Sequence, residues 1–225
     1  MMVNSTGQSD FIAYLTGNRS GSSGDGRVPP LKELSRELEI SVSRLREQVE
    51  AAKTLGFINV RPRVGIRRLE YSFRPAVASS LLYGIQEDQD RFNQFLDLRR
   101  HVETAYFDQA GRALTAVDHE QLRSLIQQAW KKLRGRPVRI PHQEHRKFHL
   151  TIYRRLDNVF VIGLLEAYWD AYESVGLNVY ADLSYLEEVW TYHQKVAAAL
   201  EKGRYQEGRR NLQDHFELLM DRLGS

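Results

Sequence analysis

Hydrophobic residues recur every three to four positions along most of the chain, which is the period of an amphipathic α-helix. From Pro75 onward this period dominates, and strand signals nearly vanish. The predicted helices cover residues 76–86, 89–112, 118–133, 142–156, 158–177, 182–202 and 205–223. We therefore expect this part of the chain to form an all-α antiparallel bundle of six or seven helices.

The first part of the chain has a different order of elements. After Pro29-Pro30, the leucines of residues 31–38 fall at helical spacing, and Ser41 can cap the start of a second amphipathic helix. Two short apolar segments, 57–60 and 66–69, follow and flank a turn that contains proline and glycine. Helix, turn, helix and hairpin in this order predict a winged helix-turn-helix, so the fold is expected to be mostly α with a small β-hairpin wing.

Charge is divided unevenly between these two parts. The 225-residue chain has a formal net charge of only +3. Residues 27–68 contain ten Lys or Arg and five acidic residues, so this short segment has a charge of +5, whereas residues 69–225 sum to about −1. We expect a DNA-binding domain over residues 1–70, a linker over 71–78 and a ligand-binding helical domain over 79–225, because a basic module is suited to a polyanion.

Composition excludes several classes of protein. The 42% of hydrophobic and 27% of charged residues are typical of a globular protein. Residues 159–165, the longest apolar run, are far shorter than the ~20 residues of a bilayer helix, and residues 1–10 lack the pattern of a signal peptide. We therefore expect a cytoplasmic protein with no membrane partner. Because the chain has no cysteine, a metal would have to be held by His, Asp or Glu.

The stretch GRVPPLKELSRELEISVSRLREQVEAAKTLGFINVRPRVGIRRL, from Gly26 to Leu69, resembles the winged-helix domain of the GntR family of bacterial transcription regulators. The resemblance implies double-stranded operator DNA as a partner. The candidate DNA-binding residues are Lys32, Ser41, Ser43, Arg44, Arg46, Arg61, Arg63 and Gly65. The family usually has Arg directly after the serine that opens the recognition helix, and Val42 stands there, so Arg44 is a possible substitute. The alternative is that these arginines only solvate a helix face.

The rest of the chain, from Ser79 to Leu223, resembles the FCD effector domain of the FadR subfamily of GntR regulators. The motifs FLDLRRHVE, HRKFHLTIYRRLDN and YHQKVAAALEKGRYQEGRRNLQDHF carry this resemblance. In many members an Asp and three His hold a divalent cation, but His145 occupies the Asp position here. The resemblance implies the metal ligands His145, His149, His193 and His215. It also implies effector contacts from Arg99 and Asn158.

The spacing of the histidines independently supports a metal site. His145 and His149 are four residues apart and share one helix face, whereas Glu144 points about 100° away from it. His193 and His215 lie on two helices that we expect to be antiparallel neighbours. Imidazole ligands favour a divalent transition metal, with zinc expected and nickel possible. The alternative is a set of hydrogen-bonded core histidines whose metal was lost when Asp became His.

These observations predict a homodimeric transcription regulator that senses a small carboxylate and is not an enzyme. A histidine in place of the Asp leaves the cation its full charge, which favours an anionic guest. Arg99 is expected to clamp that carboxylate, or else to form a surface ion pair with Glu103. Two alternatives stay open, a metal-free domain that binds an acyl-type ligand and a metal-dependent hydrolase. The hydrolase is disfavoured because no Glu lies between His145 and His149 to act as a base.

Overall fold

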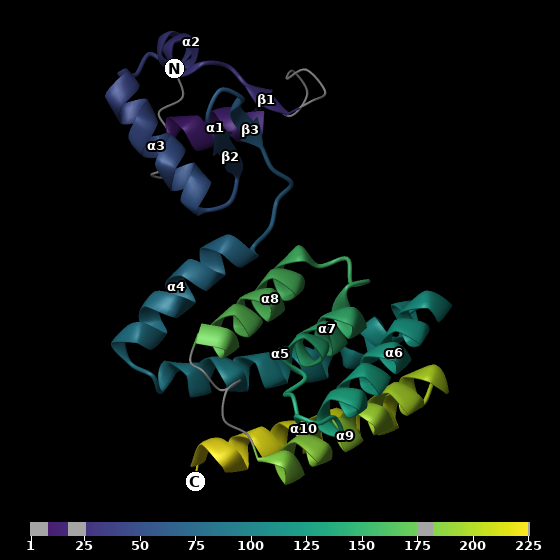
Figure 1. Cartoon of the computed structure of the whole chain (residues 1–225). Coiled ribbons are helices and arrows are strands. Elements are labelled where there is room, and N and C mark those ends of the chain that lie inside the picture. The colour runs from purple at the N-terminus through teal and green to yellow at the C-terminus, as the bar shows by residue number, and fades with distance from the viewer. Residues whose placement is uncertain (1–8, 18–25, 175–181, 225) are drawn as a thin grey trace. The chain divides into compact units, whose positions relative to one another are not determined.

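A computed structural model describes residues 9–17, 26–174 and 182–224 of the chain (Figure 1). The chain divides into two compact units, Met1–Ala76 and Val77–Ser225. The first unit contains a small antiparallel sheet and three short helices, and the second is built from helices. This architecture confirms the predicted fold class, a winged helix-turn-helix followed by an all-α bundle.

The first unit begins with a helix that the hydrophobic pattern did not predict. Its elements are α1 (Asp10–Gly17), β1 (Arg27–Val28), α2 (Leu31–Glu37), α3 (Val42–Thr54), β2 (Ile58–Arg61) and β3 (Gly65–Arg68). Helix α1 contributes Phe11 and Leu15 to a core that includes Leu34 of α2 and Leu45 of α3. Because Phe11 is completely buried, α1 is an integral part of this small domain.

Local backbone chemistry defines the ends of α3 and the tip of the wing. The hydroxyl of Ser41 accepts a hydrogen bond from the backbone N–H of Arg44, which caps the start of α3. After α3, Gly56 has a φ of 76°, and a Cβ there would lie 2.5 Å from Cγ of Pro75. The wing turn also needs positive φ angles, 65° at Arg63 and 95° at Gly65.

The sheet has the order β1-β3-β2, with antiparallel pairing throughout. Val60 lies opposite Ile66 in the hairpin that the sequence predicts, and Val28 of β1 pairs with the other side of Ile66. Strand β1 contains only two residues, which is too short to show the alternation of apolar and polar residues that identifies a strand in a sequence. It converts the predicted hairpin into a three-stranded wing.

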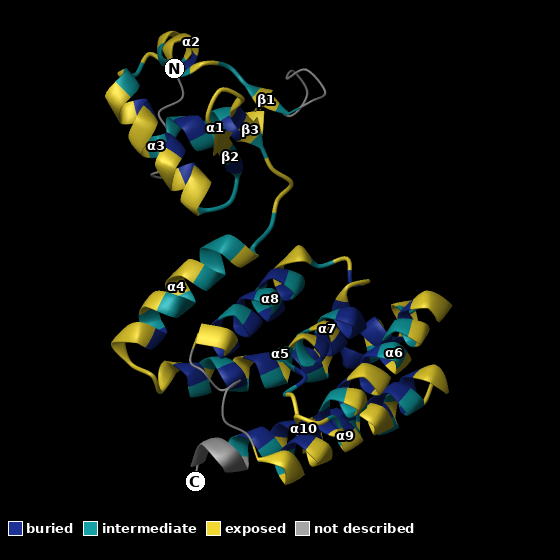
Figure 2. Cartoon of the chain, in the orientation of Figure 1, coloured by how far each residue is buried: buried dark blue, intermediate teal, exposed yellow. Residues whose placement is uncertain are grey.

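The helical unit follows the predicted pattern closely. Its helices are α4 (Arg74–Glu87), α5 (Arg91–Ala113), α6 (Ala116–Leu133), α7 (His142–Tyr153), α8 (Val159–Ser174), α9 (Leu183–Glu201) and α10 (Tyr205–Gly224). The predicted end of α8 at residue 177 lies outside the described residues. Within the described ranges, no helix is long and apolar enough to cross a membrane. Buried residues line the faces on which the helices meet (Figure 2).

Small residues bring α5 close to the C-terminal helices. A Cβ on Gly111 of α5 would lie 2.7 Å from Cδ2 of Leu200, and a Cβ on Gly208 of α10 would lie 2.9 Å from Cε1 of Phe107. Neither glycine has space for a larger side chain. This close packing places α5, α9 and α10 around one interior, into which the candidate functional residues project.

A buried carboxylate joins the start of α6 to the end of α7. Asp118 is fully buried, and it accepts hydrogen bonds from the backbone N–H and hydroxyl of Thr115 at 2.8 and 2.6 Å. Arg154 and Arg155, which follow α7, also bind this carboxylate. Burial acts to raise the pKa of Asp118, but these hydrogen bonds outweigh it and hold the pKa well below its usual range. Asp118 is therefore ionised and fastens two helices together.

We predict that Asp118→Ala lowers the free energy of unfolding by about 2–3 kcal/mol, because it removes the carboxylate half of the capping box at the start of α6 and leaves two arginines without their partner. Chemical denaturation of the full chain measures this loss. Asp214→Ala, at an exposed position on α10, is the matched control and should have almost no effect. An equal loss in both variants would contradict the role of Asp118.

Candidate metal and effector site

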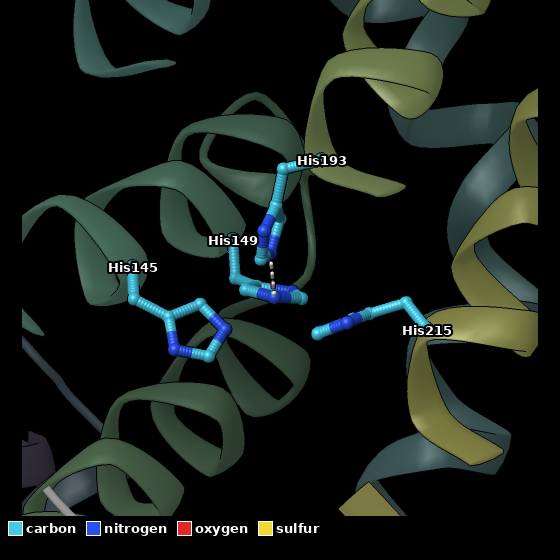
Figure 3. A group of neighbouring side chains, drawn as sticks. All are labelled: His145, His149, His193 and His215. Carbon is cyan, nitrogen blue, oxygen red and sulfur yellow. Dashed lines mark hydrogen bonds between the residues drawn. The ribbon is translucent and has the colours of Figure 1, made fainter. Parts of the chain in front are cut away.

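Three helices bring four histidines together inside the bundle (Figure 3). Helix α7 contributes His145 and His149, α9 contributes His193, and α10 contributes His215. One nitrogen from each ring belongs to a set in which no two atoms are farther apart than 4.8 Å. The structure thus places all four predicted ligands in one cluster, although they span 71 positions of the sequence (215 − 145 + 1).

The distances within the cluster are close to those of a metal site. Nε2 of His149 and Nε2 of His193 are 3.1 Å apart, and the ring centroids of His193 and His215 are 4.5 Å apart. Four-coordinate zinc with bonds of about 2.0–2.1 Å separates its nitrogen ligands by roughly 3.3–3.4 Å. The wider pairs, at up to 4.8 Å, would have to close by more than 1 Å to reach this range. With this closure, the geometry fits a divalent ion with imidazole ligands.

Unpaired nitrogen atoms give a second indication. Among the described residues, Nε2 of His145, Nδ1 of His193 and Nδ1 of His215 are buried without a hydrogen-bond partner. Buried polar atoms in native proteins are nearly always paired, because an unpaired one costs about 1–3 kcal/mol. Three such nitrogens in one cluster are unusual for core histidines. A bound cation would pair with one nitrogen from each ring, and the donor set consists of the borderline ligands that zinc and nickel prefer.

The protonation state of the cluster suits the same role. Burial lowers the pKa of His145, His193 and His215 well below the ordinary value, and neighbouring positive groups lower it further. Burial also lowers the pKa of His149, although Glu103 partly opposes the shift. All four imidazoles are therefore neutral near pH 7, and the neutral imidazole is the form that binds metals.

Glu144 lies outside the cluster, as its position on the helix predicts. Its carboxylate accepts a hydrogen bond of 2.7 Å from Nζ of Lys132 on α6. The neighbouring His145 instead packs against Trp169 of α8, with ring centroids 4.8 Å apart. The geometry favours His145 over Glu144 as the fourth candidate ligand.

Arg99 of α5 lies beside the cluster in a fully buried ion pair. Its Nε donates a hydrogen bond of 2.5 Å to Oε1 of Glu103, and both side chains are at most 1% exposed. The sequence predicted that Arg99 either clamps a carboxylate or pairs with Glu103 at the surface. The pair with Glu103 is present, but the prediction of a surface position was wrong. Nη2 of Arg99 has no hydrogen-bond partner in the described part of the chain. Arg99 thus retains a donor for another group.

Two residues of α8 that the sequence analysis missed surround this arginine. The guanidinium carbon of Arg99 lies 4.0 Å from the ring centroid of Tyr168 and 4.9 Å from that of Trp169. The Tyr168 hydroxyl and the Trp169 Nε1 are buried, and neither donates a hydrogen bond to another described residue, although Arg99 interacts with the Tyr168 oxygen. Burial raises the pKa of Tyr168 to about 12, so its hydroxyl keeps its proton. In the sequence, Tyr168 and Trp169 lie within an apolar helical segment, so they could not be distinguished from ordinary core residues.

Asn158, the other predicted effector contact, has a structural role. Its Oδ1 accepts hydrogen bonds from the backbone N–H groups of Phe160 and Val161, which caps the start of α8. Its Nδ2 donates a hydrogen bond of 3.3 Å to the hydroxyl of Tyr106. These contacts join Asn158 to the frame of the bundle, and none of them joins it to the histidines.

The predicted DNA-binding residues occupy a different unit and share one property, exposure to solvent (Figure 2). They lie on α2, at the start of α3 and on the wing: Lys32, Ser41, Ser43, Arg44, Arg46, Arg61, Arg63 and Gly65. The structure adds Arg67 and Arg68, which line a hollow on the wing together with Arg61 and Gly65. Arg44 also donates a hydrogen bond of 3.1 Å to Asp10 of α1.

Comparisons with known proteins agree with this two-part organisation. The FCD domain family model matches residues 94–218, which is more than half of the chain. No curated protein matches the sequence significantly. Streptococcus agalactiae GntR has a similar fold, with a TM-score of 0.66 and 18% identity over 93% of this chain and 95% of that chain. Lar, which controls the expression of the Listeria monocytogenes agr system, matches with a TM-score of 0.50 and 15% identity over 94% and 93% of the two chains.

The buried imidazoles predict a specific pH dependence for the metal-free protein. Their pKa values in the folded state are below about 6.5, the value expected in the unfolded chain, so the unfolded state binds more protons as the pH falls. Above pH 6.5 the rings are neutral in the folded and the unfolded state, and the protein has its full stability. Below pH 6.5 the free energy of unfolding falls by up to about 1.4 kcal/mol per pH unit for each ring. Melting temperatures measured in a chelator should therefore drop between pH 7.5 and pH 5.5.

His193→Gln should make this drop smaller, because it removes one buried ionisable ring. His101→Gln, at an exposed position on α5, should leave the drop unchanged. A melting temperature that is constant over this pH range in the wild-type protein would contradict the buried neutral state of the histidines.

Proposed function

Because this chain belongs to the FCD domain family, we propose that it is a DNA-binding transcription regulator of the GntR type that senses a metal-bound carboxylate. It belongs to the FadR subfamily and acts as a homodimer. The helical unit binds one divalent transition metal, zinc or nickel, together with a small carboxylate effector, and this binding changes the affinity of the winged helices for a palindromic operator. The observation that carries the proposal is the cluster of four neutral histidines, three of them buried and His145 half-buried, beside a buried arginine.

Charge and exposure support the DNA-binding part. The capped start of α3 and the wing both present arginines to solvent, and no acidic side chain interrupts residues 61–68. A helix N-terminus favours anions, and exposed arginines pair well with phosphates and with guanine. A single winged helix covers few base pairs, so a two-fold operator with two modules is the expected target.

We predict that Arg46→Ala weakens operator binding about tenfold or more, since Arg46 is exposed on the recognition helix. Fluorescence anisotropy with a promoter fragment from the native genome measures this change over a series of salt concentrations. Arg210→Ala, an exposed arginine on α10, is the control and should bind like the wild type. Equal affinity of Arg46→Ala and the control would contradict the assigned DNA-binding surface.

The metal-binding part depends on the chemistry of the donor set. His145, His149, His193 and His215 would hold the ion, and neutral ligands would leave it with its full positive charge. A cation in this state attracts a carboxylate as a further ligand.

Elemental analysis of the purified protein should find about one transition-metal ion per chain, and His193→Ala should remove most of it. His101→Ala should retain the metal, because this exposed ring lies outside the cluster. If the wild-type protein remains metal-free after dialysis against zinc, the metal part of the proposal fails and a metal-free, acyl-type effector domain is favoured.

The unpaired donors beside the cluster support a carboxylate as the effector. Nη2 of Arg99, Nε1 of Trp169 and the hydroxyl of Tyr168 can all donate a hydrogen bond. Their partner must be an acceptor, and a carboxylate offers two acceptor oxygens with a negative charge that complements Arg99. The aromatic rings around the guanidinium add cation–π contacts that keep it in place.

A panel of small mono- and dicarboxylates should contain at least one that changes operator affinity by about 5–150-fold, the range of a typical coupling energy. The effect should be much weaker in Trp169→Phe, which removes one donor but keeps an aromatic ring. Tyr83→Phe, at an exposed position on α4, should respond like the wild type. If only acyl thioesters, sugar phosphates or amino acids change operator affinity, the carboxylate assignment is wrong.

A further inference from the structure

Glu103 of α5 makes two hydrogen bonds that join the arginine to the histidine cluster. Its side chain is completely buried. Oε1 accepts a hydrogen bond of 2.5 Å from Nε of Arg99, and Oε2 pairs with Nδ1 of His149 at 2.8 Å. Arg99 is a permanent cation, and this buried ion pair holds the Glu103 side chain as a carboxylate, which can only accept hydrogen bonds.

This arrangement determines which nitrogen of His149 carries the proton. A carboxylate has no proton to donate, so the neutral imidazole must place its own proton on Nδ1. Nε2 then has a free lone pair, and it points toward Nε2 of His193, 3.1 Å away. Nε2 of His149 thus faces the centre of the cluster in the form that a metal requires.

We propose that Glu103 is the positioning residue of this site. One of its carboxylate oxygens holds the metal ligand His149, and the other holds the effector-binding Arg99. This inference rests on the proposed function for the identity of the two groups that Glu103 joins. An effector carboxylate that binds Arg99 then acts on the same side chain that orients His149. The metal and the effector are coupled through one buried glutamate.

An amide cannot replace this carboxylate. Glutamine has one acceptor oxygen and one N–H₂ donor, so in Glu103→Gln either Arg99 or His149 meets a donor instead of an acceptor. If the amide nitrogen faces His149, the ring must move its proton to Nε2, where it blocks the metal. If it faces Arg99, a buried guanidinium loses its partner.

The test uses the full-length protein, with zinc affinity measured by competition with a chelator. Glu103→Gln should weaken zinc binding about 10–100-fold, as is usual when the partner of a metal-bound histidine is lost. The double variant Arg99→Met with Glu103→Gln should recover much of this affinity, because the glutamine oxygen is then free for His149. Arg99→Met alone measures how much of the recovery comes from removing a positive charge near the ion. Glu144→Gln is the matched control, a buried salt-bridged glutamate on α7, and should bind zinc like the wild type.

A second measurement does not depend on the metal. Nitrogen-15 chemical shifts of the histidines in the metal-free protein report the tautomer of each ring. His149 should carry its proton on Nδ1 in the wild type, whereas in Glu103→Gln part of the population should carry it on Nε2. Circular dichroism melts establish that each variant is folded, and the double variant removes the buried charge that is most disruptive to folding.

The two possible failures are distinguishable. Zinc affinity of Glu103→Gln within twofold of the wild type, with an unchanged tautomer of His149, overturns the role of Glu103 while the metal site stands. Absence of zinc binding in the wild type overturns the proposed metal site, and the tautomer measurement still decides whether Glu103 orients His149.

Discussion

The burial of polar side chains in the interior of one helical bundle constrains everything built around them. Three imidazoles, one guanidinium and one carboxylate are almost completely buried, and the half-buried His145 completes the group, so their charges and hydrogen bonds must be balanced among themselves. The Arg99–Glu103 pair accounts for the two formal charges, and burial keeps the rings neutral. What remains is a surplus of unpaired nitrogens and donors in one place. A core selected only for stability would have apolar residues there.

The surrounding fold keeps these groups in position. Glycines at positions 111 and 208 allow α5 to approach α9 and α10 closely, and Asp118 fastens α6 to the end of α7. The histidines therefore project from helices whose spacing is set by contacts at other positions along the bundle. The winged-helix unit has a core of its own, and among its exposed charged residues the basic ones outnumber the acidic ones. The basic residues proposed to bind DNA and the histidine cluster proposed to bind a small ligand are separated along the chain, which is the organisation expected of a ligand-responsive regulator.

Much of this organisation could be predicted from the sequence because helical periodicity is strong. The long helices, the pair His145 and His149 on one face, and the exclusion of Glu144 all follow from 3.6 residues per turn. Other features depend on contacts between distant residues and had no local signal. Glu103 and His149 are 46 positions apart, so their hydrogen bond could not be inferred from spacing. Helix α1 and the two-residue strand β1 are too short for a clear period, and their partners in the domain determine their structure. The donors of Trp169 and Tyr168 are indistinguishable in the sequence from ordinary core aromatics.

X-ray absorption spectroscopy of the zinc-loaded, full-length protein is the direct test of the histidine site, because it reports the atoms around the ion itself. We expect a nearest shell dominated by nitrogen at about 2.0–2.1 Å, with the outer-shell scattering of several imidazole rings. In His215→Ala, about one ring should be missing from this pattern. A shell of oxygen atoms without imidazole scattering, identical in the wild type and the variant, would show that the ion binds elsewhere and would contradict the assignment of the histidine cluster as a metal site.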